Sequence, residues 1–259
     1  VGSKKGTKVS FLEELGGTLL FLKALLDPQK LFSIRSEDLL SQLLKILASS
    51  WGTIALTGFF VGGIMVVQFS LQLLQFDALT YLGALATSGT VREVGPLLIG
   101  FILTAKVGAF TAAELGTLKV TDQIDALRCL GADPLREMII PRFVAVVFAS
   151  LFLLILGLVA SLLGGIVAAY LLVGLSPLEY VRHIPQFLHW YSAFSGLLKC
   201  ILFSMALALI SLYRGAHADG GARGVGIAVV KSAVESLLAL VFLDWLSSAF
   251  LNQILEAFR

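Results

Sequence analysis

Five long apolar segments, separated by short polar ones, dominate this chain. They cover residues 51–74, 94–113, 143–175, 195–213 and 227–251. A helix needs about 20 mostly apolar residues to cross the hydrocarbon core of a membrane, and all five segments reach about that length. The pattern therefore predicts an all-α integral membrane protein with five transmembrane helices.

Residues 1–47 follow a different pattern. Their apolar side chains recur at helical spacing, acidic residues interrupt them, and no small-residue cleavage motif follows. This is typical of an amphipathic helix in the membrane interface, not of a cleavable signal peptide. We expect an interfacial region, 1–47, followed by a five-span domain, 48–259. The apolar stripe of the interfacial helix comprises Phe11, Leu15, Leu19, Leu22 and Leu26.

Composition agrees with a membrane protein and excludes other classes. Hydrophobic residues make up 58% of the chain, against about 45–50% in soluble domains. The net charge of +2 gives no electrostatic reason to expect nucleic acid as a partner. Cys129 and Cys200 form no CxxC pair, and the histidines have no acidic or cysteine partner at a recognisable spacing. We therefore expect neither a metal site nor a catalytic centre.

The positive charges predict the orientation in the membrane. Short connections that are rich in Lys and Arg stay on the cytoplasmic side of the membrane. Fourteen of them lie before the first apolar segment or around the second and fourth connections, and only three lie on the opposite side. The amino terminus is thus predicted to be cytoplasmic and the carboxyl terminus periplasmic. The three on the opposite side are Arg92, Arg182 and Arg259.

The most polar stretch between two apolar segments is the connection around residues 112–142. A short helix is predicted here, capped by Thr121 and ended by Gly131. A second short helix would open at Asp133 and end before Pro141. From periodicity alone, the first helix either rests on lipid headgroups or docks into a partner. Its apolar stripe consists of Val120, Ile124, Leu127 and Leu130.

Five motifs follow one another between residues 92 and 145: R-E-x-G-P, A-E-L-G-T, V-T-x-Q-I-D-A-L, D-P-L-R and P-R-F. In this order they closely resemble the MlaE family, permease subunits of ABC transporters that move phospholipids together with MCE-domain proteins. Weaker similarity in residues 220–234 and 243–245 extends the resemblance over about residues 45–250. At one position the chain departs from the family. Lys106 stands where Arg is usual, which keeps a basic group but not its bidentate geometry.

The resemblance implies a fold, a function and partners. The fold is an interfacial helix and five spans, with a coupling helix after span two that docks into a cytoplasmic ATPase. The function implied is transport of phospholipid, or a related lipid, between the bacterial inner membrane and a periplasmic MCE-domain protein. The permease would lie in that inner membrane as a homodimer. The residues of the coupling helix would be Val120, Thr121, Asp122, Ile124, Asp125, Leu127 and Arg128.

The chain itself carries no motif for nucleotide hydrolysis. It lacks the G-x-x-x-x-G-K-[ST] phosphate loop, so we expect it to bind no cofactor and to be a permease rather than an enzyme, with ATP and Mg²⁺ on the partner ATPase. The alternative is a stand-alone secondary transporter or channel. Such proteins usually have more spans, or repeats and broken helices.

Charged residues within the apolar segments are candidate functional sites because a charge in a membrane is costly unless paired or hydrated. Arg92, Glu93 and Lys199 lie at similar depth near the outer side and could bind an anionic lipid headgroup. Alternatively, Arg92 and Glu93 pair with each other while Lys199 snorkels to the interface.

On the inner side, Lys106 and Glu235 are each about 12 Å from the cytoplasmic ends of their segments, which predicts a structural ion pair. Glu114 would brace the coupling connection, and Asp244 would bond within the bundle. Small residues in span one would let two copies of the chain pack closely along a two-fold axis. These are Gly58, Gly62 and Gly63.

Overall fold

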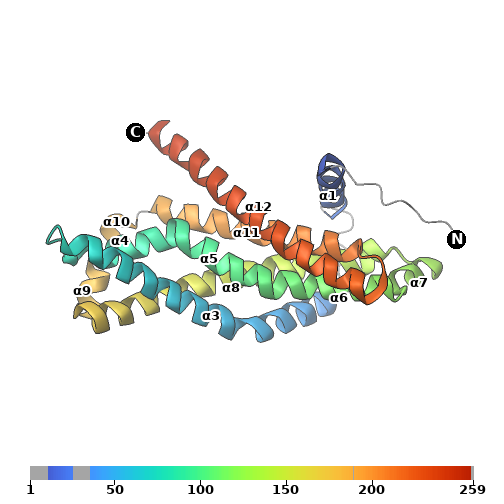
Figure 1. Cartoon of the computed structure of the whole chain (residues 1–259), viewed down its shortest axis with the longest axis horizontal. Coiled ribbons are helices and arrows are strands. Elements are labelled where there is room, and N and C mark those ends of the chain that lie inside the picture. The colour runs from blue at the N-terminus through green and yellow to red at the C-terminus, as the bar shows by residue number, and fades with distance from the viewer. Residues whose placement is uncertain (1–10, 26–35, 189, 258–259) are drawn as a thin grey trace.

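The computed structural model describes residues 11–25, 36–188 and 190–257. This part of the chain is helical throughout apart from short turns, without a β-strand, which confirms the predicted all-α class. Figure 1 shows an elongated bundle with α7 (Gln123–Cys129) at one end and α9 (Pro177–Arg182) and α10 (Ile184–Phe187) at the other. We refer to these as the α7 end and the α9 end.

Five helical segments are long and apolar enough to cross a membrane, which confirms the five predicted spans. Each of these segments is longer than predicted, because the helix continues past the predicted ends of the apolar run. Span one is α3 (Ser36–Leu74), span four α11 (Trp190–Ala216) and span five α12 (Gly221–Ala257). Span two comprises η1 (Leu79–Tyr81), α4 (Leu82–Gly89), η2 (Thr90–Val94), α5 (Gly95–Leu103), η3 (Thr104–Gly108) and α6 (Ala109–Val120). Span three comprises η4 (Leu135–Ile139), α8 (Ile140–Ala168) and η5 (Ala169–Val173).

Spans two and three contain π-helical turns, and two of these precede prolines. The turn η2 precedes Pro96, and η4 precedes Pro141. Proline has no N–H to donate and its ring clashes with the preceding turn, so a wider turn keeps the helix continuous. The sequence predicted a short helix ending before Pro141. That prediction is wrong, because η4 continues directly into α8.

Helices α3 and α8 form the most extensive pair in the bundle. A Cβ on Gly58 would collide with the carbonyl oxygen of Gly157, and a Cβ on Gly62 with that of Ser161. Gly63 also faces α8, with a Cβ position 3.7 Å from that of Ala168. These glycines therefore pack two helices of one chain closely together. The prediction that they lie on a two-fold axis between two copies of the chain is wrong.

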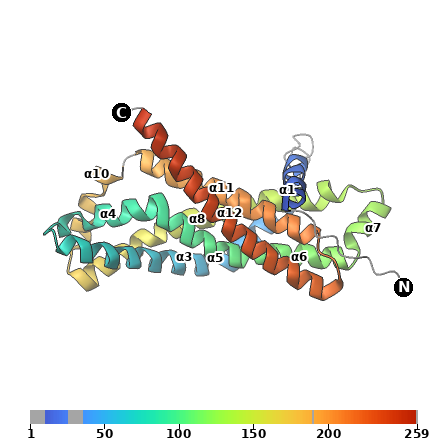
Figure 2. The same ribbon diagram turned by 45° about the horizontal axis from the view of Figure 1, so that its top comes forward.

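Of the remaining long helices, α11 packs against α8 and α6. Helix α12 packs against α11 and α6, and its carboxyl-terminal end leans away from the bundle toward the α9 end (Figures 1 and 2).

The predicted amino-terminal helix is confirmed as α1 (Phe11–Leu25), beside α11 and toward the α7 end (Figure 2), while its place in the membrane interface stays a prediction. Its protein-facing side differs from the predicted stripe. Leu25 is fully buried and Phe21 packs edge-on against Tyr213 with ring centroids 5.7 Å apart, whereas Leu19 is exposed. Leu26 of the predicted stripe lies outside the described residues. The predicted domain boundary after residue 47 falls inside α3, which runs across it.

The connection after span two begins differently from the prediction. Helix α6 continues to Val120, so Thr121 ends that helix instead of capping the next one. The Thr121 hydroxyl donates to the carbonyl of Thr117 at 2.8 Å. Asp122 then takes a left-handed conformation, with φ 57°, before α7 begins.

The end of this connection follows the prediction. Gly131 has φ +78°, a conformation that suits glycine after a helix. The carboxylate of Asp133 accepts a hydrogen bond from the N–H of Leu135 at 3.0 Å, where span three opens.

Candidate functional site

A fully buried lysine joins three spans toward the α9 end of the bundle. Lys199 on α11 donates to the carboxylate of Glu93 on η2, and to the hydroxyl of Ser248 on α12 at 2.7 Å. It also forms an ion pair with Asp244 Oδ1 at 2.9 Å, and Ser248 Oγ donates to Glu93 Oε2 at 2.8 Å. We call these four residues the Lys199 cluster. The ammonium thus has two hydrogen-bond acceptors, on Glu93 and Ser248, and a second carboxylate, that of Asp244, in ion-pair contact.

The Lys199 cluster decides between the two interpretations of these charges only in part. Lys199 is 0% exposed, so the alternative in which it snorkels to the interface is wrong. Glu93 bonds to Lys199 and has a side chain that is 40% exposed, while Asp244 is 17% exposed. Arg92 lies beside Glu93 in the same turn, η2. Two carboxylates thus share one ammonium, with one carboxylate reaching the surface.

Toward the α7 end, the predicted pair of Lys106 and Glu235 does not form. Glu235 on α12 instead accepts two hydrogen bonds from the guanidinium of Arg214. Arg214 Nε lies 2.5 Å from Glu235 Oε2, and Arg214 Nη2 donates to Glu235 Oε1. Lys106 Nζ donates to the hydroxyl of Thr53 on α3 at 2.6 Å. The prediction matched Lys106 to Glu235 by their similar depth in the membrane. It failed because depth does not determine the direction in which a side chain points around its helix.

Glu114 on α6 holds two cations where spans one, two and three meet. Lys45 Nζ on α3 lies 3.1 Å from Glu114 Oε1, and Arg142 Nη2 on α8 lies 3.5 Å from the same oxygen. The side chain of Arg142 is only 11% exposed, whereas that of Lys45 is 59% exposed. Glu114 therefore links the start of the polar connection to both neighbouring spans.

The predicted apolar stripe of the short helix is buried against the protein at Ile124 and exposed at Leu130. Ile124 is 3% exposed and belongs to the main hydrophobic core, while Leu130, just after α7, is 82% exposed. Asp125 accepts from Lys119 at 3.0 Å and from Arg128 at 2.8 Å. The hydrogen bond from Lys119 and the nearby positive charges lower the pKa of Asp125 below its usual range. The pair with Lys119 ties α7 to the end of α6, while the pair with Arg128 lies within α7.

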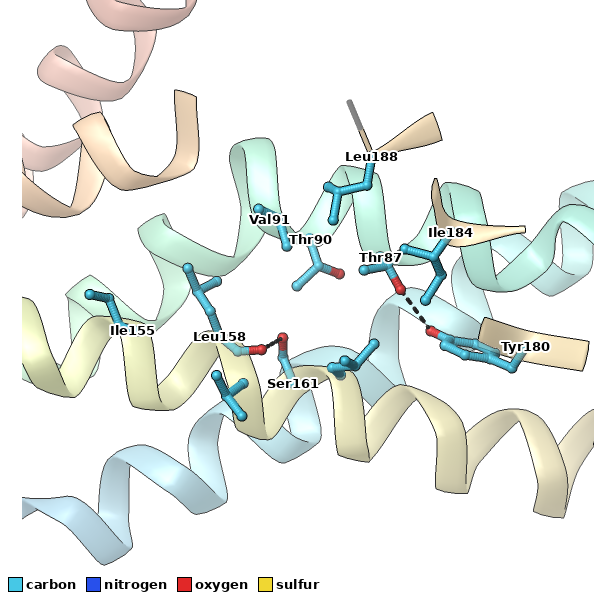
Figure 3. Close-up of a pocket in the computed structure, with 12 residues that line it drawn as sticks. Thr87, Thr90, Val91, Ile155, Leu158, Ser161, Tyr180, Ile184 and Leu188 are labelled. Atoms are coloured by element: carbon cyan, nitrogen blue, oxygen red, sulfur yellow. Dashed lines mark hydrogen bonds between the residues drawn. The ribbon is translucent and has the colours of Figure 1, made fainter. Parts of the chain in front are cut away.

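A pocket of about 230 Å³ opens between α3, α8 and the segments at the α9 end (Figure 3). Its lining is mainly apolar, and its hydroxyl groups bond within the chain. Tyr180 on α9 faces Thr87 with their hydroxyl oxygens 3.4 Å apart, and Ser161 donates to the carbonyl of Leu158. Burial raises the pKa of Tyr180. The pocket thus suits an apolar group better than a charged one.

Comparison with known proteins assigns the family. A family model described as permease MlaE matches residues 39–250. The chain belongs to the MlaE permease family. It is therefore a multi-pass membrane permease of the ABC-transporter type.

Curated relatives cover nearly all of this MlaE-family permease. A probable ABC transporter permease protein of Rickettsia typhi is 29% identical over 250 residues, which cover 95% of both chains. A probable ABC transporter permease protein of a Synechocystis strain is 30% identical over 82% of both chains. The intermembrane phospholipid transport system permease protein MlaE of Haemophilus influenzae is 28% identical over 94% of both chains.

Sequence reasoning on this permease missed three contributors to its charged sites. Ser248 has no signal of its own, because a serine in an apolar segment usually bonds to its own helix. Arg214 stands at the end of span four, where it passes for one of the cytoplasmic cations. Thr53 likewise has nothing to distinguish it. Only the rotation of each helix brings these side chains to Lys199, Glu235 and Lys106.

Proposed function

We propose that this MlaE-family permease is the membrane subunit of an ABC transporter that moves phospholipid, or a related lipid, between the inner membrane and a periplasmic MCE-domain partner. The name of the Haemophilus relative, which describes intermembrane phospholipid transport, supports the substrate class. The chain has no phosphate loop, so ATP hydrolysis belongs to a separate cytoplasmic subunit. The α7 end is the cytoplasmic end, in agreement with its excess of Lys and Arg.

The observation that carries this proposal is the Lys199 cluster. It ties spans two, four and five together near the periplasmic side through one ammonium. A lipid phosphate that arrives at the exposed edge of Glu93 competes with two carboxylates for Lys199. Because all of its acceptor neighbours lie on other spans, binding of a headgroup loosens the hold on α12. Arg92 precedes Glu93 in the same turn and is the second cation proposed to contact the headgroup.

The cavity for a whole lipid is proposed to form between two copies of the chain. The pocket of about 230 Å³ within one chain is smaller than the 300–1,000 Å³ of typical small-ligand sites, and a two-tailed lipid needs more. A homodimer with closed two-fold symmetry supplies such a space at its interface.

The cytoplasmic connection is proposed to receive the motion of the ATPase. Its exposed surface consists of the turn at Asp122, the outer side of α7 and Leu130, since Ile124 is occupied in the core. Leu130→Asp is expected to reduce coupling of ATP hydrolysis to lipid transfer. Ile124→Asp is unsuitable for this purpose because it would place a carboxylate in the hydrophobic core.

One experiment tests the proposed function as a whole. The chain is purified from native membranes with its associated proteins, and transfer of a fluorescent phospholipid out of proteoliposomes is measured with ATP, without ATP, and for Lys199→Glu. ATP-dependent transfer that the variant loses supports the proposal. Purification without an ATPase, or transfer that proceeds without ATP, favours the stand-alone transporter instead.

A further inference from the structure

Lys106 is an intramembrane cation that contacts no carboxylate among the residues that the structure describes. It sits in the π-helical turn η3 of span two. Among the residues that the structure describes, its recorded partner is the neutral hydroxyl of Thr53. Lys199 and Arg214, in contrast, contact carboxylates. A charge within a span is costly unless paired or hydrated, so an anion from outside the chain is favoured at Lys106.

Lys106 lines a groove of about 250 Å³ between α3 and span two. The two helices run antiparallel here, since Lys45 contacts Glu114 while Thr53 contacts Lys106. Lys45 and Thr53 are about 12 Å apart along α3 at 1.5 Å per residue. The groove thus has one lysine toward its cytoplasmic mouth and one deeper in the membrane. Its lining consists of Lys45, Ile46, Ser49, Ser50, Lys106, Val107 and Phe110.

A neighbouring cavity adds to the excess of positive charge. Lys45 and Phe110 line both spaces, and the neighbour also contains Arg142 and Glu114. Arg142 Nη1 is buried there without a hydrogen-bond partner in the described part of the chain. The described lining of the two spaces therefore contains three cationic side chains, Lys45, Lys106 and Arg142, and one carboxylate, that of Glu114, which contacts Lys45 and Arg142. This balance attracts an anion to the groove.

We infer that this groove binds the phosphate of a phospholipid headgroup from the inner leaflet, with Lys106 as the deep contact and Lys45 at the mouth. A soluble phosphate compound has the same charged group. The lipid is favoured because Phe110, beside the lysines, is 48% exposed and offers an apolar surface to acyl chains. The inference rests on the orientation given in the proposed function, but it requires lipid binding only and holds whether or not lipid is moved.

The test measures lipid binding to the purified full chain in a phosphate-free detergent. Dioleoyl phosphatidylglycerol is titrated and bound lipids are counted by native mass spectrometry; a diazirine-bearing phosphatidylglycerol then maps the contact by cross-linking. Lys106→Gln is expected to weaken binding about tenfold, the loss of one charge-assisted hydrogen bond, and to remove cross-links to α3 and α6. Lys106→Arg should retain both. The matched control is Lys231→Gln, an exposed lysine on span five.

Three outcomes overturn the inference. The first is equal binding by wild type and Lys106→Gln. The second is inorganic phosphate binding as tightly as the lipid, which assigns the groove to a soluble anion. The third is loss of the dimer, with lipid binding unchanged, in Lys106→Gln, which assigns the counter-charge to a second copy of the chain.

The same variants separate this inference from the proposed function. Retained cross-linking in a preparation that shows no ATP-driven lipid transfer counts against transport alone. Transfer at the wild-type rate by a Lys106→Gln protein that no longer cross-links leaves the proposed function standing, and supports an inner-leaflet site that transport does not require.

Discussion

Charged side chains are paired to different extents near the two ends of the bundle. Near the α9 end, Lys199 is fully buried and its neighbours are two carboxylates and a hydroxyl of the same chain. Near the α7 end, Lys45 and Arg142 share Glu114, and Lys106 contacts only a hydroxyl in the described structure. The first arrangement is complete within one chain, and the second is not.

This difference separates structural charge from binding charge. A buried ion pair is costly to break because a partner is left uncompensated in a medium of low polarity, so the Lys199 cluster holds its spans together until a competing anion arrives. An incompletely paired group has no such internal hold. An anionic ligand would stabilise such a group by supplying the missing counter-charge. We therefore assign ligand binding in the absence of transport to the groove at Lys106.

The largest expected effect comes from removing the centre of the complete cluster. Lys199→Met leaves Glu93 and Asp244 without their ammonium. Loss of one partner of a buried pair costs about 3–5 kcal/mol, and we expect the lower part of that range because the side chain of Glu93 is 40% exposed to water. The thermal midpoint in detergent should fall clearly, and lipid transfer should be lost.

A matched variant separates the two effects of this change. Lys199→Met combined with Glu93→Gln and Asp244→Asn leaves no unpaired charge, so the thermal midpoint should recover while transfer stays absent. A single Lys199→Met protein as stable as the wild type would contradict the view that the cluster is a structural tie.

The next effect tests the close packing that supports the complete end. Gly62→Ala places a methyl group against the backbone carbonyl of Ser161, which cannot move without separating α3 from α8. Overpacking of this kind costs about 1–3 kcal/mol. Gly63→Ala is the control, since its Cβ would lie at an ordinary 3.7 Å from that of Ala168. Equal thermal midpoints for the two variants would show that the seam between α3 and α8 is looser than described.

The sequence was sufficient for the spans and insufficient for their rotation. Length and hydropathy are local properties of each segment, so all five spans were predicted, as were the turn at Gly131 and the helix opening at Asp133. Which side of a helix faces which neighbour is decided by packing across the whole bundle. The glycines of α3 were therefore assigned to the wrong interface.

The charged sites show the same limit. Glu235 was matched to Lys106 by depth, yet Arg214 on the neighbouring α11 faces it. Ile124 was assigned to a partner because an apolar stripe does not reveal what covers it, and the core of this chain does. The departure at Lys106 was visible in the sequence, but its lack of a carboxylate partner in the described chain became visible only with the neighbouring helices in place.

A smaller effect is expected from the exposed pair of the incomplete end. Lys45 and Glu114 are 3.1 Å apart with side chains 59% and 33% exposed, and exposed pairs contribute about 0–1 kcal/mol because water and salt screen them. A double-mutant cycle with Lys45→Gln and Glu114→Gln should give a coupling energy in that range in thermal unfolding. A much larger coupling would mean that this end is as complete as the other.

The smallest effect concerns the pH dependence of α7. The hydrogen bond from Lys119 lowers the pKa of Asp125 below its usual 3.8. A lowered pKa in the folded state means that this contact stabilises α7 at every pH above the ordinary value and is lost as pH falls through the lowered one.

Cys129 is exposed and Cys200 is buried, so a fluorophore can be attached to Cys129 alone and its emission followed from pH 7 downward. Wild-type α7 should loosen with a midpoint below 3.8. Lys119→Met should raise that midpoint, because the largest cause of the lowered pKa is gone, and Asp125→Asn should abolish the transition. An identical midpoint in wild type and Lys119→Met would show that the ion pair between Lys119 and Asp125 contributes nothing to the order of α7.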